Sequence, residues 1–167
     1  MCVIVFCRSY MMGENQDNFY VTLFSNSSMK AYPNNAIAAF TVQLAHEIVL
    51  SSKDVWEVAL CEFSCPPPKT GTIAPHVVIG TTNAMVYCNL ICPQFVGSKK
   101  VRCLRTFIHP SVYCNLVFEN PYYLPLEQRT FLDISISVMD SSGKRVAFKD
   151  SHTPAKVVLH FRRVPRW

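Results

Sequence analysis

Apolar residues recur at every second position in segment after segment of this 167-residue chain. Side chains of a β-strand point alternately to opposite faces, so this period predicts strands that turn one face to a core. A chain of this length fits one domain with a substantial core. The sequence therefore predicts a single all-β domain. In its clearest strand, Phe131–Met139, the residues expected to face the core are Leu132, Ile134, Ile136 and Val138.

Two N-terminal segments have the same alternation. FYVTLF is expected to turn Phe19, Val21 and Leu23 inward, and VWEVALCEF to turn Trp56, Val58 and Leu60 inward. The stretch between them, Asn35–Leu50, fits two structures. It is either a helix capped by Asn35, with Phe40, Leu44 and Ile48 at a spacing of four, or a strand with Phe40, Val42 and Leu44 inward.

Turn residues separate the segments. Asp140–Gly143, with the sequence DSSG, is typical of a tight turn. Ser64–Pro75 contains three consecutive prolines, which supply no amide hydrogens to a sheet, so we expect a loop there. Lys156–Phe161 then provides the last strand.

The pentapeptide VYCNL occurs twice, at Val86–Leu90 and Val112–Leu116. Each copy places Val, Cys and Leu on one face and Tyr and Asn on the other, as a half-buried strand requires. A repeat array needs three or more units, and the sequence has no third copy. We therefore expect two strands with a similar packing environment.

The chain has eight cysteines, and most of them lie among apolar neighbours. The sequence has no secretory signal and no apolar run of the roughly 20 residues that a membrane-spanning helix needs. These features favour a reducing compartment, the cytosol or nucleus, with eight free and mostly buried thiols. Two CxxxC pairs leave structural zinc as an alternative, although zinc ligands usually lie on a tight CxxC turn: Cys61 with Cys65, and Cys88 with Cys92.

Enzyme motifs are absent: the sequence has no GxSxG, no HExxH and no GxxxxGK[ST]. The five histidines are scattered without an obvious carboxylate partner: His46, His76, His109, His152 and His160. Glu57, Glu62 and Asp133 alternate with core positions and are expected to face solvent. We expect no enzymatic activity, no catalytic residue, no metal and no cofactor.

The composition indicates that part of the surface of the domain contacts other protein molecules. Half of the residues are hydrophobic and only 16% are charged, fewer than usually coat a solitary soluble monomer. The net charge of +5 permits nucleic-acid binding without requiring it. A small β-barrel that binds nucleic acid is therefore the alternative function. Phe95 and Phe107 are either its exposed stacking rings or core residues, and the basic residues that flank a strand are Lys99, Lys100, Arg102 and Arg105.

The order of the segments resembles one known family, the penton-like minor capsid proteins of Polinton (Maverick) elements and the related adintoviruses and adomaviruses. Three signatures carry the resemblance, within Phe19–Phe63, Val86–Phe107 and Pro121–Arg163. Their marks are Phe19–Leu23, Ser25–Ser28, Tyr32–Asn35 and Trp56–Leu60, then Val86–Leu90, Pro93-Gln94, Val96-Gly97 and Leu104-Arg105, then PYYLPLEQRTFLDISISVMDSSGKRVAF and LHFRR.

The resemblance implies a single jelly-roll sandwich of two antiparallel four-stranded sheets, and it favours the strand for Asn35–Leu50. It implies a structural capsid protein: a penton subunit that forms homopentamers at the icosahedral vertices, beside a double jelly-roll major capsid protein. The expected location is the virion, and assembly is expected in the nucleus of the host cell. Packaged double-stranded DNA is a further expected partner, at the inner face of the capsid.

We divide the chain into an N-terminal arm at residues 1–17, a jelly-roll domain at 18–163 and a C-terminal tail at 164–167. The C-terminal FRRVPRW is expected to be a contact arm beyond the last strand, because Pro165 ends ladder pairing. Its candidate partner contacts are Arg162, Arg163, Arg166 and Trp167.

Overall fold

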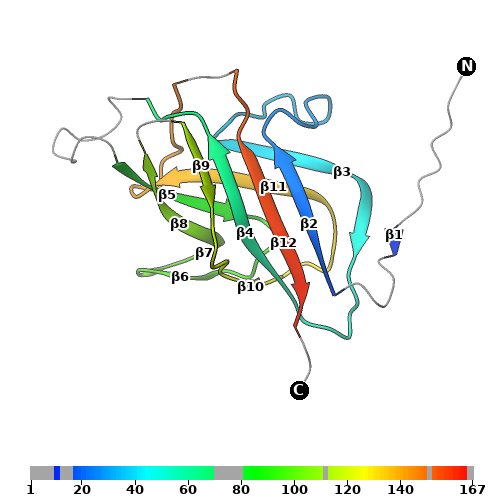
Figure 1. The fold of residues 1–167 in the computed structure, drawn as a ribbon. Coiled ribbons are helices and arrows are strands. Elements are labelled where there is room, and N and C mark those ends of the chain that lie inside the picture. The colour runs from blue at the N-terminus through cyan, green and yellow to red at the C-terminus, as the bar shows by residue number, and fades with distance from the viewer. Residues whose placement is uncertain (1–9, 12–16, 70–80, 111–112, 150–151, 165–167) are drawn as a thin grey trace, which may run out of the picture.

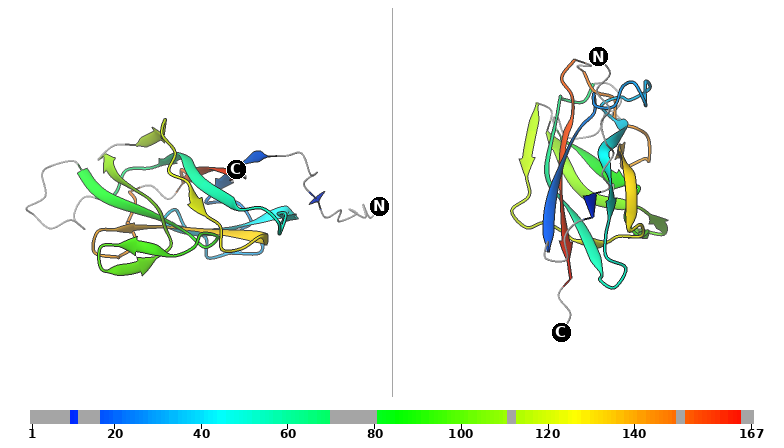
Figure 2. Two further views of the ribbon diagram at one scale, coloured as in Figure 1. Left: turned by 90° about the horizontal axis from the view of Figure 1, so that it is seen from below. Right: turned by 90° about the vertical axis from the view of Figure 1, so that its right-hand side faces the viewer.

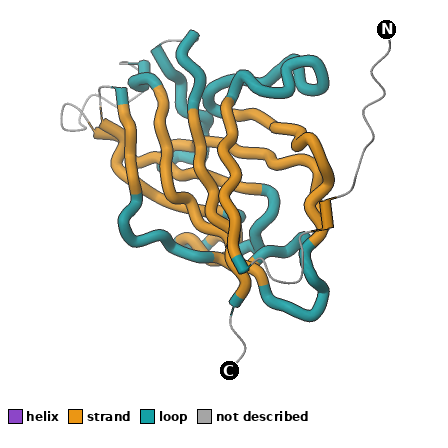
Figure 3. Tube along the Cα trace, turned by 45° about the vertical axis from the view of Figure 1, so that its right-hand side comes forward, coloured by secondary structure: helices purple, strands orange, loops and turns teal. Residues whose placement is uncertain are grey.

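Strands joined by loops make up the computed structural model, which describes residues 10–11, 17–69, 81–110, 113–149 and 152–164. No helix occurs in these ranges (Figure 3), and hence none that could span a membrane. The strands are β1 (Tyr10–Met11), β2 (Asn18–Phe24), β3 (Ala39–Val49), β4 (Trp56–Cys65), β5 (Thr81–Cys88), β6 (Gln94–Val96), β7 (Lys99–Val101), β8 (Cys103–Pro110), β9 (Cys114–Val117), β10 (Leu124–Pro125), β11 (Thr130–Asp140) and β12 (Lys156–Arg163).

Two sheets pack face to face, and Figure 1 shows the strands of one crossing in front of the other. The first sheet has the order β1-β3-β11-β5-β8, and the second has the order β10-β4-β12-β2 with β9 also paired to β4. Each sheet has five strands rather than the predicted four. The first gains the two-residue β1, which pairs in parallel with β3. In the second, β9 and β10 share one position, because they pair with successive parts of β4.

The strand pairing is nested. β2 pairs with β12, β3 with β11, β4 with β9, and β5 with β8, all antiparallel. The chain is thus a long antiparallel ribbon that is rolled up so that its successive strand pairs alternate between the two sheets. This arrangement is a jelly roll, as the sequence predicted. The division into arm, domain and tail stays a prediction, although β2 begins at Asn18 and β12 ends at Arg163.

The core fills the space between the two sheets, which Figure 2 shows edge-on in its right-hand view. Phe161 of β12 lies fully buried at its centre, stacked on Phe19 with ring centroids 4.7 Å apart and on Phe131 at 5.7 Å. Trp56 packs against Phe19 at 5.9 Å. The predicted inward faces of β2 and β4 are confirmed, since Phe19, Leu23, Trp56, Val58 and Leu60 are buried and Val21 packs against them.

The stretch that fitted either helix or strand is a strand, β3. Phe40 and Val42 are buried, and Leu44 packs against the core, as expected for the strand alternative. Asn35, the possible helix cap, instead holds the start of the strand. Its side-chain amide donates to the Thr41 carbonyl at 2.8 Å, and its Oδ1 accepts from the Thr41 amide at 2.9 Å.

The predicted inward position of Leu132 is wrong. Ile134, Ile136 and Val138 are buried as expected, but Phe131 rather than Leu132 is the core residue at the start of β11. The β11–β3 register shifts between Phe131 and Asp133, and this irregularity takes Leu132 out of the ladder. A register slip of one residue exchanges the two faces of a strand, which the plain alternation of the sequence did not reveal.

The predicted turn at Asp140–Gly143 is confirmed. The Asp140 Oδ1 accepts bonds from the Ser142 amide at 2.8 Å and the Lys144 amide at 2.9 Å, and Gly143 has a φ of 80°. A carboxylate that bonds the following amides stabilises such a turn. These bonds lower the pKa of Asp140, although burial opposes them.

Both VYCNL copies contribute to strands, as predicted. Val86 and Cys88 of β5 are buried, as is Leu90 just after it. In the second copy Cys114 is buried and Leu116 packs against the core, while Val112 lies outside the described residues.

The β11 irregularity gives a direct test of the register. Phe131→Ala should lower the free energy of unfolding by about 3–5 kcal/mol, the usual range for a buried phenylalanine, and Leu132→Ala should cost clearly less. Urea denaturation of the two variants beside the wild type measures both values. A larger loss for Leu132→Ala would restore the simple alternation and contradict the structure.

Candidate assembly surfaces

The sandwich has two flanks, formed by strands at or next to the edges of the two sheets, and the edge strand beside β3 is the two-residue β1. Figure 1 has β2 and β3 at one flank and β8 and β9 at the other. At the first, termed the β2–β3 flank, the Gln43 amide donates to the Ser28 hydroxyl at 2.9 Å. At the second, termed the β8–β9 flank, Phe107 contacts Phe118, with ring centroids 6.1 Å apart.

Large apolar side chains are exposed at the β8–β9 flank. Ile108 of β8 is 61% exposed and Val117 of β9 is 64% exposed. Tyr113 and Tyr122, in the loops next to β9, are also more than half exposed. The β6–β7 hairpin extends this surface with Phe95, and a shallow hollow lies between the hairpin, β8 and Tyr122. Large exposed apolar side chains at edge strands make this flank a candidate for contact with another molecule.

The β2–β3 flank also exposes apolar groups, on β2 and the loop that follows it. Tyr20 is 63% exposed, and Phe24 and Met29 are each about two-fifths exposed. The two flanks lie at opposite sides of the sandwich (Figure 1), so one copy of the chain presents two separate apolar surfaces. This geometry suits contacts with two neighbours at once.

A polar and aromatic cluster covers the outer face of the second sheet beside Tyr20. The His160 ring stacks on the Tyr20 ring with centroids 4.2 Å apart, and its Nδ1 lies 2.6 Å from the Tyr123 hydroxyl. The Arg162 guanidinium lies over the Tyr123 ring at 3.5 Å and donates to Glu57 Oε2 at 2.9 and 3.1 Å. A cation over an aromatic face and a charge-assisted bond together fix these side chains.

The surroundings of His160 favour the neutral form of its ring. Burial lowers the pKa of His160, and the positive charge of Arg162 lowers it further. The Tyr123 hydroxyl and His160 Nδ1 share a hydrogen bond, whereas Nε2 is enclosed with no hydrogen-bond partner among the described residues. An imidazolium would carry a hydrogen on both nitrogens, including the enclosed Nε2. Burial correspondingly raises the pKa of Tyr123.

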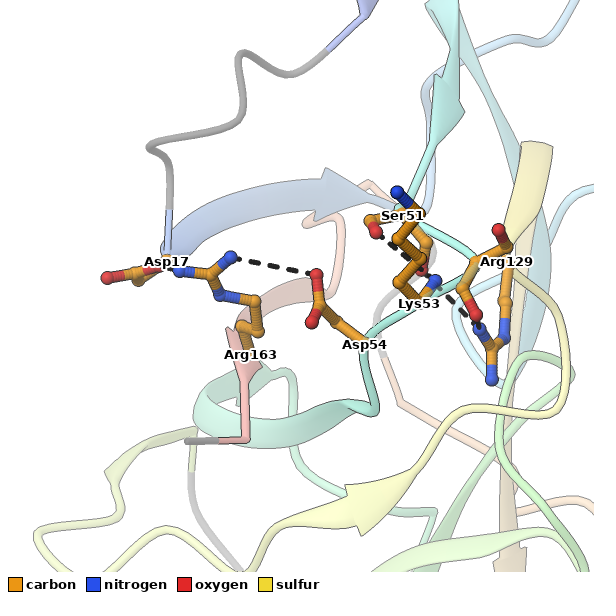
Figure 4. A network of polar contacts seen from close by, with 7 residues as sticks. Asp17, Ser51, Lys53, Asp54, Arg129 and Arg163 are labelled. Carbon is orange, nitrogen blue, oxygen red and sulfur yellow. Dashed lines mark hydrogen bonds and ion pairs between the residues drawn. The ribbon is translucent and has the colours of Figure 1, made fainter. Parts of the chain in front are cut away.

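The first part of the predicted C-terminal arm is wrong, because Phe161, Arg162 and Arg163 belong to β12. Arg163 lies in the polar network of Figure 4, where it pairs with Asp17 and with Asp54 at 3.6 Å. Nearby, Arg129 donates to the backbone carbonyl of Ser51 at 3.4 Å. The network joins β12 to the segment before β2 and to the β3–β4 loop.

The role of the four predicted contact residues stays a prediction. Arg162 and Arg163 have intramolecular partners, so binding another molecule through them requires an exchange of ion pairs. Arg166 and Trp167 lie outside the described residues.

The residues of the nucleic-acid alternative do not form one basic surface. Arg102 is paired with Glu127, and Arg105 lies over the Phe118 ring at 4.5 Å. Phe107 packs against the core, 5.1 Å from Phe63, so its ring is not a platform for a base. Lys99 and Lys100 remain exposed near Phe95 on the hairpin. Stacking platforms need exposed rings interleaved with basic side chains, and of the two phenylalanines expected to serve as platforms, Phe95 is exposed and Phe107 is not.

The expected solvent-facing carboxylates are held in contacts. Glu57 pairs with Arg162, and Glu62 with Lys156 at 2.6 Å. Asp133 is less exposed than expected: its Oδ1 is enclosed, and a hydrogen bond from Tyr32 to its side chain raises the pKa of Tyr32. Within the described ranges, no three His, Cys, Asp or Glu side chains are grouped to hold a metal ion.

The structure brings together one cysteine of a CxxxC segment and the cysteine of the second VYCNL copy. Cys65 lies beside Cys114, with the two Sγ atoms 3.3 Å apart. Cys61, Cys88, Cys92 and Cys103 are free thiols, and Cys2 and Cys7 lie outside the described residues. Sequence reasoning missed the Cys65–Cys114 contact, because only the pairing of β4 with β9 brings these residues together.

The nested strands and the two sheets define the class of protein by fold, a single jelly roll. No protein-family model matches the sequence, and a comparison with curated proteins found no match.

Among solved structures, the chain is similar to the crystal structure of the selenomethionine-labelled mavirus penton protein. The TM-score is 0.58 and the sequence identity 8%, and the match covers 88% of this chain and 100% of that chain. The likeness confirms the predicted fold, and it agrees with the resemblance to penton-like proteins in the sequence.

The His160 cluster predicts a pH dependence of stability. The unfolded chain has the ordinary histidine pKa of about 6.5 and the folded chain a lower one, so the unfolded state binds the proton more readily. The stabilising contribution is complete above about pH 6.5 and is lost as the pH falls below it. The free energy of unfolding, measured between pH 8 and pH 5, should therefore decrease less in His160→Gln than in the wild type. Equal slopes in the two proteins would contradict the assignment.

Proposed function

We propose that this protein is a structural capsid protein, a penton subunit that forms homopentamers at the vertices of an icosahedral virion. The proposal rests chiefly on the fold that it shares with the mavirus penton protein, over 88% of this chain and the whole of that one. The family resemblance of the sequence supports the same role. No residue needs to carry out chemistry in this function.

The two flanks supply the physical basis for a ring. A contact between the β8–β9 flank of one copy and the β2–β3 flank of the next is heterologous, and such contacts close into a ring when each subunit is rotated by one fifth of a turn. Ring closure would remove Ile108, Val117 and Tyr20 from water. It would also account for a chain with only 16% charged residues.

The remaining partners belong to the same proposal. A double jelly-roll major capsid protein would surround the pentamer, and packaged double-stranded DNA would lie at the inner face. The C-terminal residues Arg166 and Trp167 would contact one of them, because Trp167 is large and apolar and Arg166 attracts acidic surfaces. The protein would be located in the virion after assembly in the host cell.

The mass of the assembled particle tests whether the chain forms a pentamer. Native mass spectrometry or light scattering of the purified chain at micromolar concentration and moderate salt should give a particle of about five 19.0 kDa subunits. A chain that stays monomeric, even with the major capsid protein present, would contradict the vertex assignment.

A pair of variants tests the head-to-tail contact. Ile108→Asp and Tyr20→Asp each place a charge on one flank, and each alone should prevent ring closure, since a buried unpaired charge is costly. Mixed together, they should form only dimers, because each variant keeps one intact flank and only one productive contact is possible. Val55→Asp is the control: Val55 is 54% exposed but precedes β4 at one end of the sandwich, so its pentamers should persist. Thermal unfolding verifies that all three variants are folded.

A further inference from the structure

Cys65 and Cys114 form a buried cross-strand pair, 49 residues apart in the sequence. Cys65 is the last residue of β4 and Cys114 is the first of β9, and the two are direct partners in the antiparallel ladder. Their Sγ atoms are 3.3 Å apart. Both side chains turn into the core, where Cys65 is 0% and Cys114 2% exposed.

The backbone geometry at this pair suits a disulfide. Direct partners on antiparallel strands have Cα atoms about 4.5–5.5 Å apart, within the range of about 4.4–6.8 Å that disulfides span. A disulfide is about 2.05 Å long, so the two Sγ atoms need to approach by a little over 1 Å. Rotation of the two side chains covers this distance without moving either strand.

The pair joins a short edge strand to the second sheet. β9 has four residues, and within the described part of the chain its one strand partner is β4. A short edge strand opens locally more readily than the central strands of a sheet. A bond between Cys65 and Cys114 would fasten this strand to β4 and close a loop of about 50 residues.

We propose that Cys65 and Cys114 are a redox site that forms a disulfide with a small-molecule disulfide, such as glutathione disulfide, as the oxidant. In a reducing compartment both residues stay thiols, because a glutathione pool kept reduced reverses the reaction. The site therefore responds to the passage of the protein into an oxidising medium.

The reaction proceeds in two exchanges. One cysteine loses its proton, and its thiolate attacks a sulfur of glutathione disulfide, breaks that S–S bond and expels a glutathione thiolate. The other cysteine then loses its proton, and its thiolate attacks the first Sγ, breaks the mixed disulfide and expels the second glutathione thiolate. Two protein thiols are oxidised, one glutathione disulfide is reduced, and the two protons pass to the two glutathione thiolates.

The surroundings make this exchange slow in the closed fold. The hydrogen bond with Cys114 raises the pKa of Cys65, and burial raises it further, so the reactive thiolate is scarce. Reaction requires the local opening of β9. Oxidation should therefore be faster under conditions that loosen this edge without unfolding the domain.

Oxidation of the purified full-length chain tests the proposal. The chain is incubated with excess glutathione disulfide at pH 8, in water and in urea below the unfolding transition, and is then alkylated and digested without reduction. Mass spectrometry should find a peptide that links Cys65 to Cys114, with faster formation in urea. The oxidised chain should unfold about 10 °C higher than the reduced chain, since closing a loop of this length restricts the unfolded state. Dithiothreitol should reverse the shift.

Two variants make the outcome specific. Cys114→Ala should lose both the linked peptide and the shift in unfolding temperature, whereas Cys92→Ala should keep both. A chain in which Cys65 and Cys114 remain alkylatable thiols under both conditions, or in which one of them links to another cysteine, would overturn the proposal. The test uses the isolated chain and no particle, so its result is independent of whether the protein forms pentamers.

Discussion

The structure depends on the position of β12 between β2 and β4. Seven residues of this strand pair with β2 and eight with β4, so one strand supplies both central ladders of the second sheet. From this strand Phe161 reaches the core and stacks on Phe19 of its own sheet and Phe131 of the other. Aromatic rings bury large apolar areas, and this stack joins the two layers. The outward-facing side chains of β12, His160 and Arg162, organise the polar cluster on the opposite face.

Much of the fold could be predicted from the sequence, because alternating burial is a local property. The strands β2, β4, β11 and β12, the turn at Asp140 and both VYCNL strands follow from neighbouring residues alone. Asn35–Leu50 could not be decided locally, since Phe40 and Leu44 fit both periods. The register shift next to Leu132 could not be predicted from the sequence. It arises from the pairing of β11 with β3, not from either strand by itself.

The candidate surfaces were less predictable, because surface residues are brought together by tertiary structure. Arg162 and Arg163 looked like a basic arm, but the ladder holds them within β12 and gives them Glu57, Asp17 and Asp54 as partners. The contact between Cys65 and Cys114 has no sequence spacing that would reveal it. Exposed apolar residues such as Ile108 and Val117 carry the same alternation signal as core residues. Only the edge positions of β8 and β9 show that these side chains face outward.

The nested pairing also has a consequence for the order in which the protein folds during synthesis. β2 leaves the ribosome long before its one strand partner among the described residues, β12, which lies more than 130 residues later in the chain. The second sheet cannot be completed until β12 has emerged. Until then β2 and β4 lack the strand that pairs with both of them, and their apolar faces stay exposed. Contacts between such distant residues slow folding and leave strand edges open to other chains. We therefore expect the nascent protein to depend on chaperones until β12 is inserted between β2 and β4.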